Sequence, residues 1–402
     1  MSAAPNDASP QPLAGVKVID FTQVMMGPCA TQMLADYGAD VIKIERPKVG
    51  DLSRTSISDD PAGLDNPVFR SLNRNKRSIA LDVRNEAGKA IVYDLVRHAD
   101  VVVNNFRAGV MERIGFGYAA LSKINPRIIC AFGSGFGQNG PLAHKGGQDV
   151  LAQALSGVMA RRSDEGLPLS IYATALADYS AGMHLVQAIL LALLQREKTG
   201  RGQQISVSLY NSMLAMQMQE AAMWLQRKRD LNWGAFPLSG VFATIDGAVV
   251  LVGAFKANPL QDICRALELP DLSAEPRYAT FAGQMQHKAD LHRQFRARFA
   301  AGTTAHWLAR LEAEDLLCAP VQTLAEALAS EQTAVNGMVV SFDDAGENDA
   351  VALIGTPIDM DPSAFRLRHP PPKLGGDGED ILRELGYGPA KIAEIKASGT
   401  VS

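Results

Sequence analysis

Over the first third of the chain, segments with a strand-like pattern of apolar residues alternate with segments that have helical spacing. Short runs rich in Val and Ile predict strands at 16–22, 40–47, 78–83, 100–106 and 127–137. Stretches with apolar residues at helical spacing lie between them, at 29–38, 85–99 and 110–127. Strands that alternate with helices predict βαβ units and a parallel sheet. Ligands of such sheets bind at the carboxyl ends of the strands.

The alternation of predicted strands and helices ends near residue 230. Helices are predicted at 148–160 and 179–197, and a strand followed by a long helix at 205–229. Residues 232–255 then predict a hairpin whose turn is Asp246-Gly247, and further helices follow at 258–267, 287–301 and 304–314. We therefore expect an α/β fold with three parts. They are a tail at 1–12, a large parallel-sheet domain at 13–228 with 330–402, and a smaller α+β domain at 229–329.

Composition is that of an ordinary soluble protein. Of 402 residues, 47% are apolar and 20% are charged, and the net charge is −4. This balance gives no indication of a nucleic-acid or membrane partner. The four cysteines show no CxxC or Cys/His spacing, and the N-terminus lacks the features of a signal peptide. We expect free thiols and a cytoplasmic, or otherwise reducing, location.

Common cofactor motifs are missing. The loop after the first strand, TQVMMGPCAT, is not the GxGxxG of dinucleotide-binding proteins. The glycine-rich stretch GSGFGQNG, 133–140, lacks the GK[ST] ending of a phosphate-binding loop, and by itself it favours a simple turn. The seven histidines show no metal-binding or catalytic-triad spacing. We therefore predict neither a metal nor a redox cofactor.

Two kinds of charged residue are candidates for chemistry. Arg46 and Arg107 each follow a predicted strand end, where an arginine fork suits a phosphate group, although a solvated basic face is the alternative. Asp178 stands just before the apolar run 183–194. Asp is a preferred helix cap, but a carboxylate at the positive end of a helix is also kept ionised for chemistry. Both interpretations of Asp178 stay open.

At this point several blocks of sequence carry a resemblance. The chain resembles the class III CoA-transferases (CaiB/BaiF type), the family of the formyl-CoA:oxalate and carnitine CoA-transferases. The matching blocks begin near residue 12 and keep the family's order: PLAGVKVIDFT, GPCATQMLADYGADVIKIERP, NRNKRSIALDV, NNFRAGVMERIGFGY, GFGQNGP, ADYSAG and REKTGRGQ.

The resemblance implies a fold and a mechanism. The fold is a Rossmann-like large domain with a small domain, in two chains threaded as interlocked rings. Asp178, in ADYSAG, is then the nucleophile, which forms a mixed anhydride with the acyl group and next an aspartyl-CoA thioester. Backbone amides of Gly135 and Gly137 are candidates to stabilise the oxyanions. Coenzyme A enters as a thioester substrate, and no other cofactor is implied.

The resemblance also assigns the CoA contacts. Arg46 would meet the 3′-phosphate end of CoA. Asn105, Phe106 and Arg113 would line the nucleotide and pantetheine path. Lys76 and Arg77 are further candidates for this site.

Some positions depart from the family pattern. The oxalate enzymes carry a glutamine two residues after the position of Gln23, where this chain has Met25, followed by Met26. Phe136 and Ser134 replace a tyrosine and a lysine, which disfavours oxalate and predicts a less polar acyl pocket. The related α-methylacyl-CoA racemases have a histidine where this chain has Gln148, and an amide cannot shuttle protons as imidazole does.

The resemblance therefore implies a CoA-transferase. It would move CoA from a donor acyl-CoA, with succinyl-CoA as one candidate, to a small carboxylic or dicarboxylic acid. Two alternatives stay open, an α-methylacyl-CoA racemase or epimerase and a CoA-binding partner subunit of a heteromeric transferase.

Overall fold

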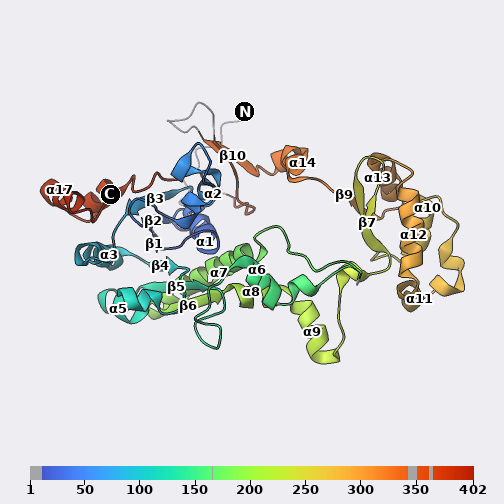
Figure 1. Cartoon of the computed structure of the whole chain (residues 1–402), viewed down its shortest axis with the longest axis horizontal. Helices are drawn as coiled ribbons and strands as arrows, with labels where there is room; N and C mark the ends of the chain where they lie inside the picture. The colour runs from blue at the N-terminus through green and yellow to red at the C-terminus, as the bar shows by residue number, and fades with distance from the viewer. Residues whose placement is uncertain (1–10, 165, 343–350, 362–364) are drawn as a thin grey trace. The chain divides into compact units, whose positions relative to one another are not determined.

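Two compact units make up the chain in the computed structural model (Figure 1). The structure describes residues 11–164, 166–342, 351–361 and 365–402. The large unit comprises Met1–Val158, Ile171–Gln217 and Val335–Ser402, and the small unit comprises Met159–Ser170 and Met218–Ala334. The small unit thus begins earlier than the predicted domain at 229–329. The predicted tail, 1–12, lies almost entirely outside the described residues.

A six-stranded parallel sheet forms the centre of the large unit (Figure 1). Its strands are β1 (Lys17–Asp20), β2 (Asp40–Glu45), β3 (Lys76–Ala80), β4 (Val101–Asn104), β5 (Ile129–Ser134) and β6 (Gln204–Ser208). Their order across the sheet, β3-β2-β1-β4-β5-β6, is that of a Rossmann fold. The predicted parallel sheet is confirmed, and its order reverses between β1 and β4.

Alternate residues of each strand enter different cores, because side chains of a strand point to opposite faces of the sheet. Ile19, for example, joins one apolar cluster, whereas Val18 joins another. The first cluster includes residues of α3 (Glu86–His98), α5 (Tyr118–Ile124), α16 (Gly378–Glu384) and α17 (Pro389–Ala397). The second includes residues of α1 (Met26–Asp36) and α7 (Leu176–Thr199). Strands β1 to β5 are therefore buried on both faces, whereas the edge strand β6 is partly exposed.

Helix α7 is a core element of the large unit. By length and composition alone, it is the one helix of the described residues that passes a test for a membrane span. A buried helix of a soluble protein passes the same test, and one such helix is weak evidence. Ala181, Leu185 and Ile189 of α7 are fully buried, and the helix packs against α1, β5, β6 and α8 (Leu209–Met216). We therefore interpret α7 as a packing helix.

Gly182 lets α1 and α7 approach closely. A Cβ atom at this position would lie 2.3 Å from Cys29 Sγ and 2.7 Å from the carbonyl oxygen of Met26. Gly182 stands one helical turn after Asp178, so both residues lie on the same side of α7. The close contact thus brings the first turn of α1 next to the aspartate.

Buried ion pairs hold the segments that follow β1 and β2. The Lys43 ammonium lies 2.8 Å from the Asp51 carboxylate and donates a 2.8 Å hydrogen bond to the carbonyl of Thr22. Arg54 makes a bidentate contact with Glu45, with both nitrogen–oxygen distances at 2.8 Å. Because buried charges are stable only when paired, these contacts fix the loop after β1 to the neighbouring strand.

The small unit contains a three-stranded antiparallel sheet (Figure 1). Its strands are β7 (Ser239–Ala243), β8 (Ala248–Val252) and β9 (Leu317–Pro320). The predicted hairpin and its Asp246-Gly247 turn are confirmed. Strands β7 and β8 are antiparallel, and Ala243 pairs with Ala248 next to the turn. The predicted helices correspond to α10 (Pro259–Ala266), α12 (Lys288–Phe299) and α13 (Thr304–Ala313). They share an apolar core with the sheet, as an α+β domain does.

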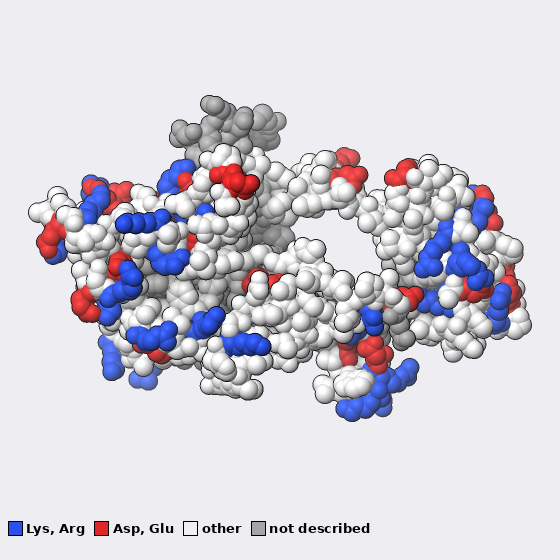
Figure 2. All heavy atoms as spheres, viewed as in Figure 1, with Lys and Arg blue, Asp and Glu red and all other residues white. Residues whose placement is uncertain are grey.

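Charges are mixed over the surface. On the face that Figure 2 shows, Lys and Arg side chains are interspersed with Asp and Glu. This distribution agrees with the near-balanced composition of the chain.

The close contact at Gly182 gives a stability prediction. We expect Gly182→Ala to lower the free energy of unfolding by about 1–3 kcal/mol, because the added methyl group overpacks the contact between α1 and α7. Cys29→Ala removes the nearest atom, so the double variant should recover part of the loss. Urea denaturation measures both effects. Equal stability of wild type and Gly182→Ala would show that the helices separate at no cost.

Candidate active site

A cavity opens where the strand order reverses, at the carboxyl ends of β1 and β4. Its volume is about 420 Å³. It is lined by residues of several segments that follow strands or begin helices, among them Gln23, Met25, Asn105, Gly135, Gln148 and Asp178. The reversal of strand order leaves a crevice in which doubly wound proteins bind their ligands. The fold therefore brings distant parts of the sequence to one site.

Asp178 is not the cap of its own helix. It lies at the third position of α7, and the cap residue Ala175 makes no side-chain hydrogen bond. Instead Asp149, the first residue of α6 (Asp149–Leu155), accepts hydrogen bonds from the amides of Ala177 at 2.7 Å and Asp178 at 2.9 Å. A carboxylate from a neighbouring helix thus satisfies the start of α7. The Asp178 side chain is left to line the cavity.

The environment of Asp178 makes its carboxyl group unusually basic. Burial raises its pKa to about 6, and the negative charge of Asp149 acts in the same direction. A hydrogen bond from the backbone of Met26 partly opposes this rise. Near neutral pH the group is mostly ionised, but its charge is poorly solvated and therefore reactive.

Two glycines let two backbone segments meet beside the cavity. A Cβ atom on Gly135 would lie 2.4 Å from the Cα atom of Gly147, and one on Gly147 would lie 2.3 Å from that of Gly135. Both residues line the cavity. Only glycine fits at either position, and the result is a wall of exposed backbone.

Asn105 fixes the loop that faces Asp178. Its side chain accepts a 2.8 Å hydrogen bond from the Gln23 amide and donates a 2.7 Å hydrogen bond to the Gln23 carbonyl. The next residue, Val24, has φ +67°, which is costly for a β-branched side chain. Its amide donates to the Asp51 carboxylate at 3.0 Å. The buried network of the large unit thus holds a strained backbone at the cavity.

A second cavity, of about 690 Å³, lies in the same unit. Arg46 and Lys48 supply positive charge to its lining, whereas Arg84 is paired there with Asp82 at 2.9 Å. Gln23 and Phe106 line both cavities, so the two adjoin at these residues. A long ligand with an anionic end in one cavity and a reactive end in the other is compatible with this arrangement.

The structure brings together most of the predicted site residues. Gln23, Met25, Met26, Asn105, Phe106, Gly135, Gln148 and Asp178 line the first cavity, and Arg46 lines the second. Five predicted residues are absent from both linings: Gly137, Phe136, Arg113, Lys76 and Arg77. The Gly137 amide donates to Ser134 Oγ at 3.0 Å, so it is already engaged, and the Phe136 ring lies 6.5 Å from that of Tyr210.

The structure contradicts a ligand-binding role for Lys76 and Arg77. Lys76 is completely buried, and its ammonium donates to Asp20, Pro28 and Asn73 at 3.0–3.1 Å. Arg77 pairs with Asp40 at 2.8 Å and Glu384 at 2.7 Å. Both side chains belong to β3 and stabilise the fold, because their charges are already satisfied within the chain.

Sequence reasoning missed several residues of the site. Asp149 and Gly147 stand on either side of Gln148 in GGQDV, a segment used only to judge the position of a histidine. Among the described residues, no group of three His, Cys, Asp or Glu side chains is arranged to hold a metal ion.

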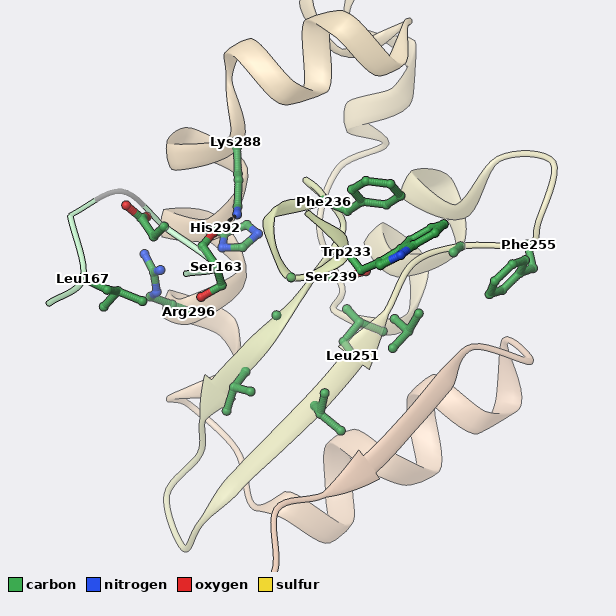
Figure 3. A pocket seen from close by; sticks show the side chains of 17 residues that line it. Ser163, Leu167, Trp233, Phe236, Ser239, Leu251, Phe255, Lys288, His292 and Arg296 are labelled. Atoms are coloured by element: carbon green, nitrogen blue, oxygen red, sulfur yellow. Dashed lines mark hydrogen bonds between the residues drawn. The ribbon is translucent and has the colours of Figure 1, made fainter. Parts of the chain in front are cut away.

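The small unit has a cavity of its own, of about 780 Å³ (Figure 3). Aromatic and aliphatic side chains such as Trp233, Phe236 and Leu251 line it. Lys288 donates to the carbonyls of Ser163 at 2.8 Å and Ala235 at 3.0 Å, and His292 contacts the Pro237 carbonyl at 2.9 Å. These two polar groups hold the backbone in place.

Comparisons with known proteins agree with this geometry. The model of CoA-transferase family III matches residues 13–378. The succinyl-CoA:glutarate CoA-transferase of Mus musculus is 35% identical over 98% of this chain and 91% of its own sequence. The acetyl-CoA:oxalate CoA-transferase of Acetobacter aceti is 34% identical over 94% of this chain and 97% of its own.

A solved structure supports the same conclusion. The crystal structure of a CaiB/BaiF family protein from Brucella suis superposes with a TM-score of 0.82 at 30% identity, covering 94% of this chain and 100% of that one. The fold and site thus define an α/β enzyme that transfers coenzyme A. The chain belongs to CoA-transferase family III.

The raised pKa of Asp178 gives a prediction about stability. The folded state binds the proton of this group more tightly than the unfolded state, so ionisation of Asp178 destabilises the fold, fully so above about pH 6. We expect Asp178→Asn to raise the free energy of unfolding at pH 8 by about 1–2 kcal/mol, discounted for partial exposure. The gain should shrink as the pH falls from 6 towards 4.

Urea denaturation at pH 8 and pH 5 measures this difference. Asp315→Asn is the control, because Asp315 is fully exposed and should show no comparable gain. A stabilisation that is the same at both pH values would mean that the charge of Asp178 is not its cause.

Proposed function

We propose that Asp178 is the nucleophile that carries CoA from a donor acyl-CoA to an acceptor acid. The observation that supports this most is the capping of α7 by Asp149, because it leaves the Asp178 carboxylate free at the cavity. A carboxylate with a pKa near 6 is both ionised at neutral pH and more nucleophilic than an ordinary aspartate.

The exchange proceeds through two kinds of covalent intermediate, mixed anhydrides and an aspartyl-CoA thioester. An oxygen of Asp178 attacks the thioester carbonyl and the carbon–sulfur bond breaks. The products are a mixed anhydride of Asp178 and the CoA thiolate. The thiolate then attacks the aspartyl carbonyl, which releases the donor carboxylate and forms an aspartyl-CoA thioester. The acceptor carboxylate then attacks the aspartyl-CoA thioester, which forms a second mixed anhydride and expels the CoA thiolate. The thiolate attacks the acceptor carbonyl of this anhydride, which releases the new acyl-CoA and restores the Asp178 carboxylate. No net proton, electron or water is consumed.

The adjoining cavities support a placement of CoA. Its phosphates would meet Arg46 and Lys48, because arginine and lysine pair with phosphate oxygens. The pantetheine arm would pass Gln23 and Phe106, which line both cavities. The thioester would then reach Asp178 beside the backbone of Gly135 and Gly147. Amide groups of that wall are suited to a developing oxyanion.

The proposed substrates are small acids and their CoA esters. The named relatives act on succinyl-CoA with glutarate and on acetyl-CoA with oxalate. Met25 and Met26 line the cavity of this chain and favour a substrate with a methylene chain over oxalate. Gln148 also lines it, and because its amide cannot relay a proton, its presence argues against a racemase.

A homodimer in the cytoplasm is part of the proposal. Leu190, Leu191 and Leu194 of α7 are exposed, which supports the expectation that a second chain covers this patch. Activity of the purified chain alone would exclude the requirement for a different partner subunit.

Chemical trapping tests the nucleophile. With succinyl-CoA, we expect borohydride or hydroxylamine to modify the peptide that contains Asp178, as detected by mass spectrometry. Asp178→Asn should abolish both the adduct and transfer, with a loss of about 10³-fold or more, because the covalent route is lost. Asp315→Asn should behave as wild type. An active Asp178→Asn enzyme without an adduct would disprove the mechanism.

The pH dependence tests the electrostatics. We expect kcat/KM to fall as the pH is lowered through about 6, because protonated Asp178 cannot attack. Asp149→Asn removes the like charge but keeps an oxygen that can cap α7, so the acid limb should move to lower pH. If the acid limb of the kcat/KM profile lies at the same pH in Asp149→Asn as in wild type, the limb reports a group other than Asp178.

A further inference from the structure

We propose that Arg107 and Lys145 bind the second carboxylate of a dicarboxylic substrate. This inference rests on the proposed function, and it names the residues that select the substrate class. Both side chains line the cavity that contains Asp178, and together with Asp178 they are its only charged lining residues among those described.

Two different segments place the cations. Arg107 follows β4 directly after Asn105 and Phe106, whereas Lys145 lies in the loop before α6. Gly146 connects them, because a Cβ atom at that position would lie only 2.7 Å from Nη2 of Arg107. The guanidinium therefore rests against the backbone next to Lys145. A side chain at position 146 would displace it.

Neither cation has a partner within the described residues. No ion pair or side-chain hydrogen bond of Arg107 or Lys145 occurs there, and both side chains are exposed. Several other arginines of the large unit are engaged, as Arg54 is with Glu45 and Arg74 with Asp36. Two free cations at one cavity are suited to an anion from solution, and a carboxylate binds both charge-assisted donors well.

The geometry also favours one arrangement of the substrate. One carboxyl group must reach Asp178 to exchange its thioester. Met25, Met26 and Leu209 line the same cavity and offer apolar surface to a methylene chain. The far carboxylate would then meet Arg107 and Lys145. A monocarboxylic acid of equal length leaves both cations without an anion, so it should be the poorer substrate.

Acceptor specificity tests this assignment. Glutarate and pentanoate have the same number of carbons and differ in the second carboxylate. With succinyl-CoA as donor, we expect Arg107→Gln and Lys145→Gln each to lower kcat/KM for glutarate about 10-fold or more. The value for pentanoate should change less than about 3-fold. Lys123→Gln, an exposed lysine of α5 outside both cavities, should leave both values unchanged.

A charge reversal provides a gain-of-function arm. Lys145→Glu should improve 5-aminopentanoate relative to glutarate, because the cationic end of that acid then meets a carboxylate. An equal loss with both glutarate and pentanoate, or a rise in KM for acetyl-CoA, whose acyl group has no second carboxylate, would assign the cations to CoA phosphates instead. Unchanged kinetics in both Gln variants would also overturn the proposal.

The adduct at Asp178 separates this inference from the proposed function. If trapping succeeds in the variants but their acid selectivity is that of wild type, the carboxylate-binding role fails and the nucleophile stands. If wild type forms no adduct, the proposed function fails, and the glutarate-to-pentanoate ratio still reports whether the cations select dicarboxylates.

Discussion

The site depends on a single carboxylate that takes no part in the proposed bond changes. Asp149 satisfies the amides of Ala177 and Asp178, which every helix start leaves without a partner. If Asp178 had to satisfy them itself, its oxygens would be occupied and its pKa would fall. Because the cap comes from α6, the same interaction orients α7, frees Asp178 and places a negative charge near it. The Asp149 carboxylate thus determines both the position of α7 and the reactivity of Asp178.

A second constraint is the rigidity of the loop after β1. Val24 adopts a backbone conformation that a valine avoids, and it is held there by Asp51 on one side. Asp51 is itself paired with Lys43, which also contacts the Thr22 carbonyl. Buried pairs of this kind add little net stability, but breaking one leaves an uncompensated charge. They therefore restrict the loop to one conformation, at the point where Met25 and Met26 line the cavity.

Sequence patterns predicted the scaffold better than the site. Alternation of strands and helices gave the parallel sheet, and the Asp246-Gly247 turn gave the hairpin, because both depend on local periodicity and turn chemistry. Lys76 and Arg77 were misassigned because the sequence does not show where Asp20, Asp40 and Glu384 lie. Only the folded chain shows that their charges are already paired.

The same limit explains why the sequence does not reveal the roles of Asp149 and Gly147, although both flank Gln148. A cap supplied from another helix leaves no local signature, unlike a capping box within one helix. Gly147 is required only because Gly135, twelve residues earlier, approaches it. Contacts between distant segments decide which carboxylate caps a helix and which one lines the cavity. The sequence predicts the segments, but it does not show which of them are in contact. The difference between a helix cap and a nucleophile is therefore tertiary, and the position of Asp178 in its own helix cannot decide it.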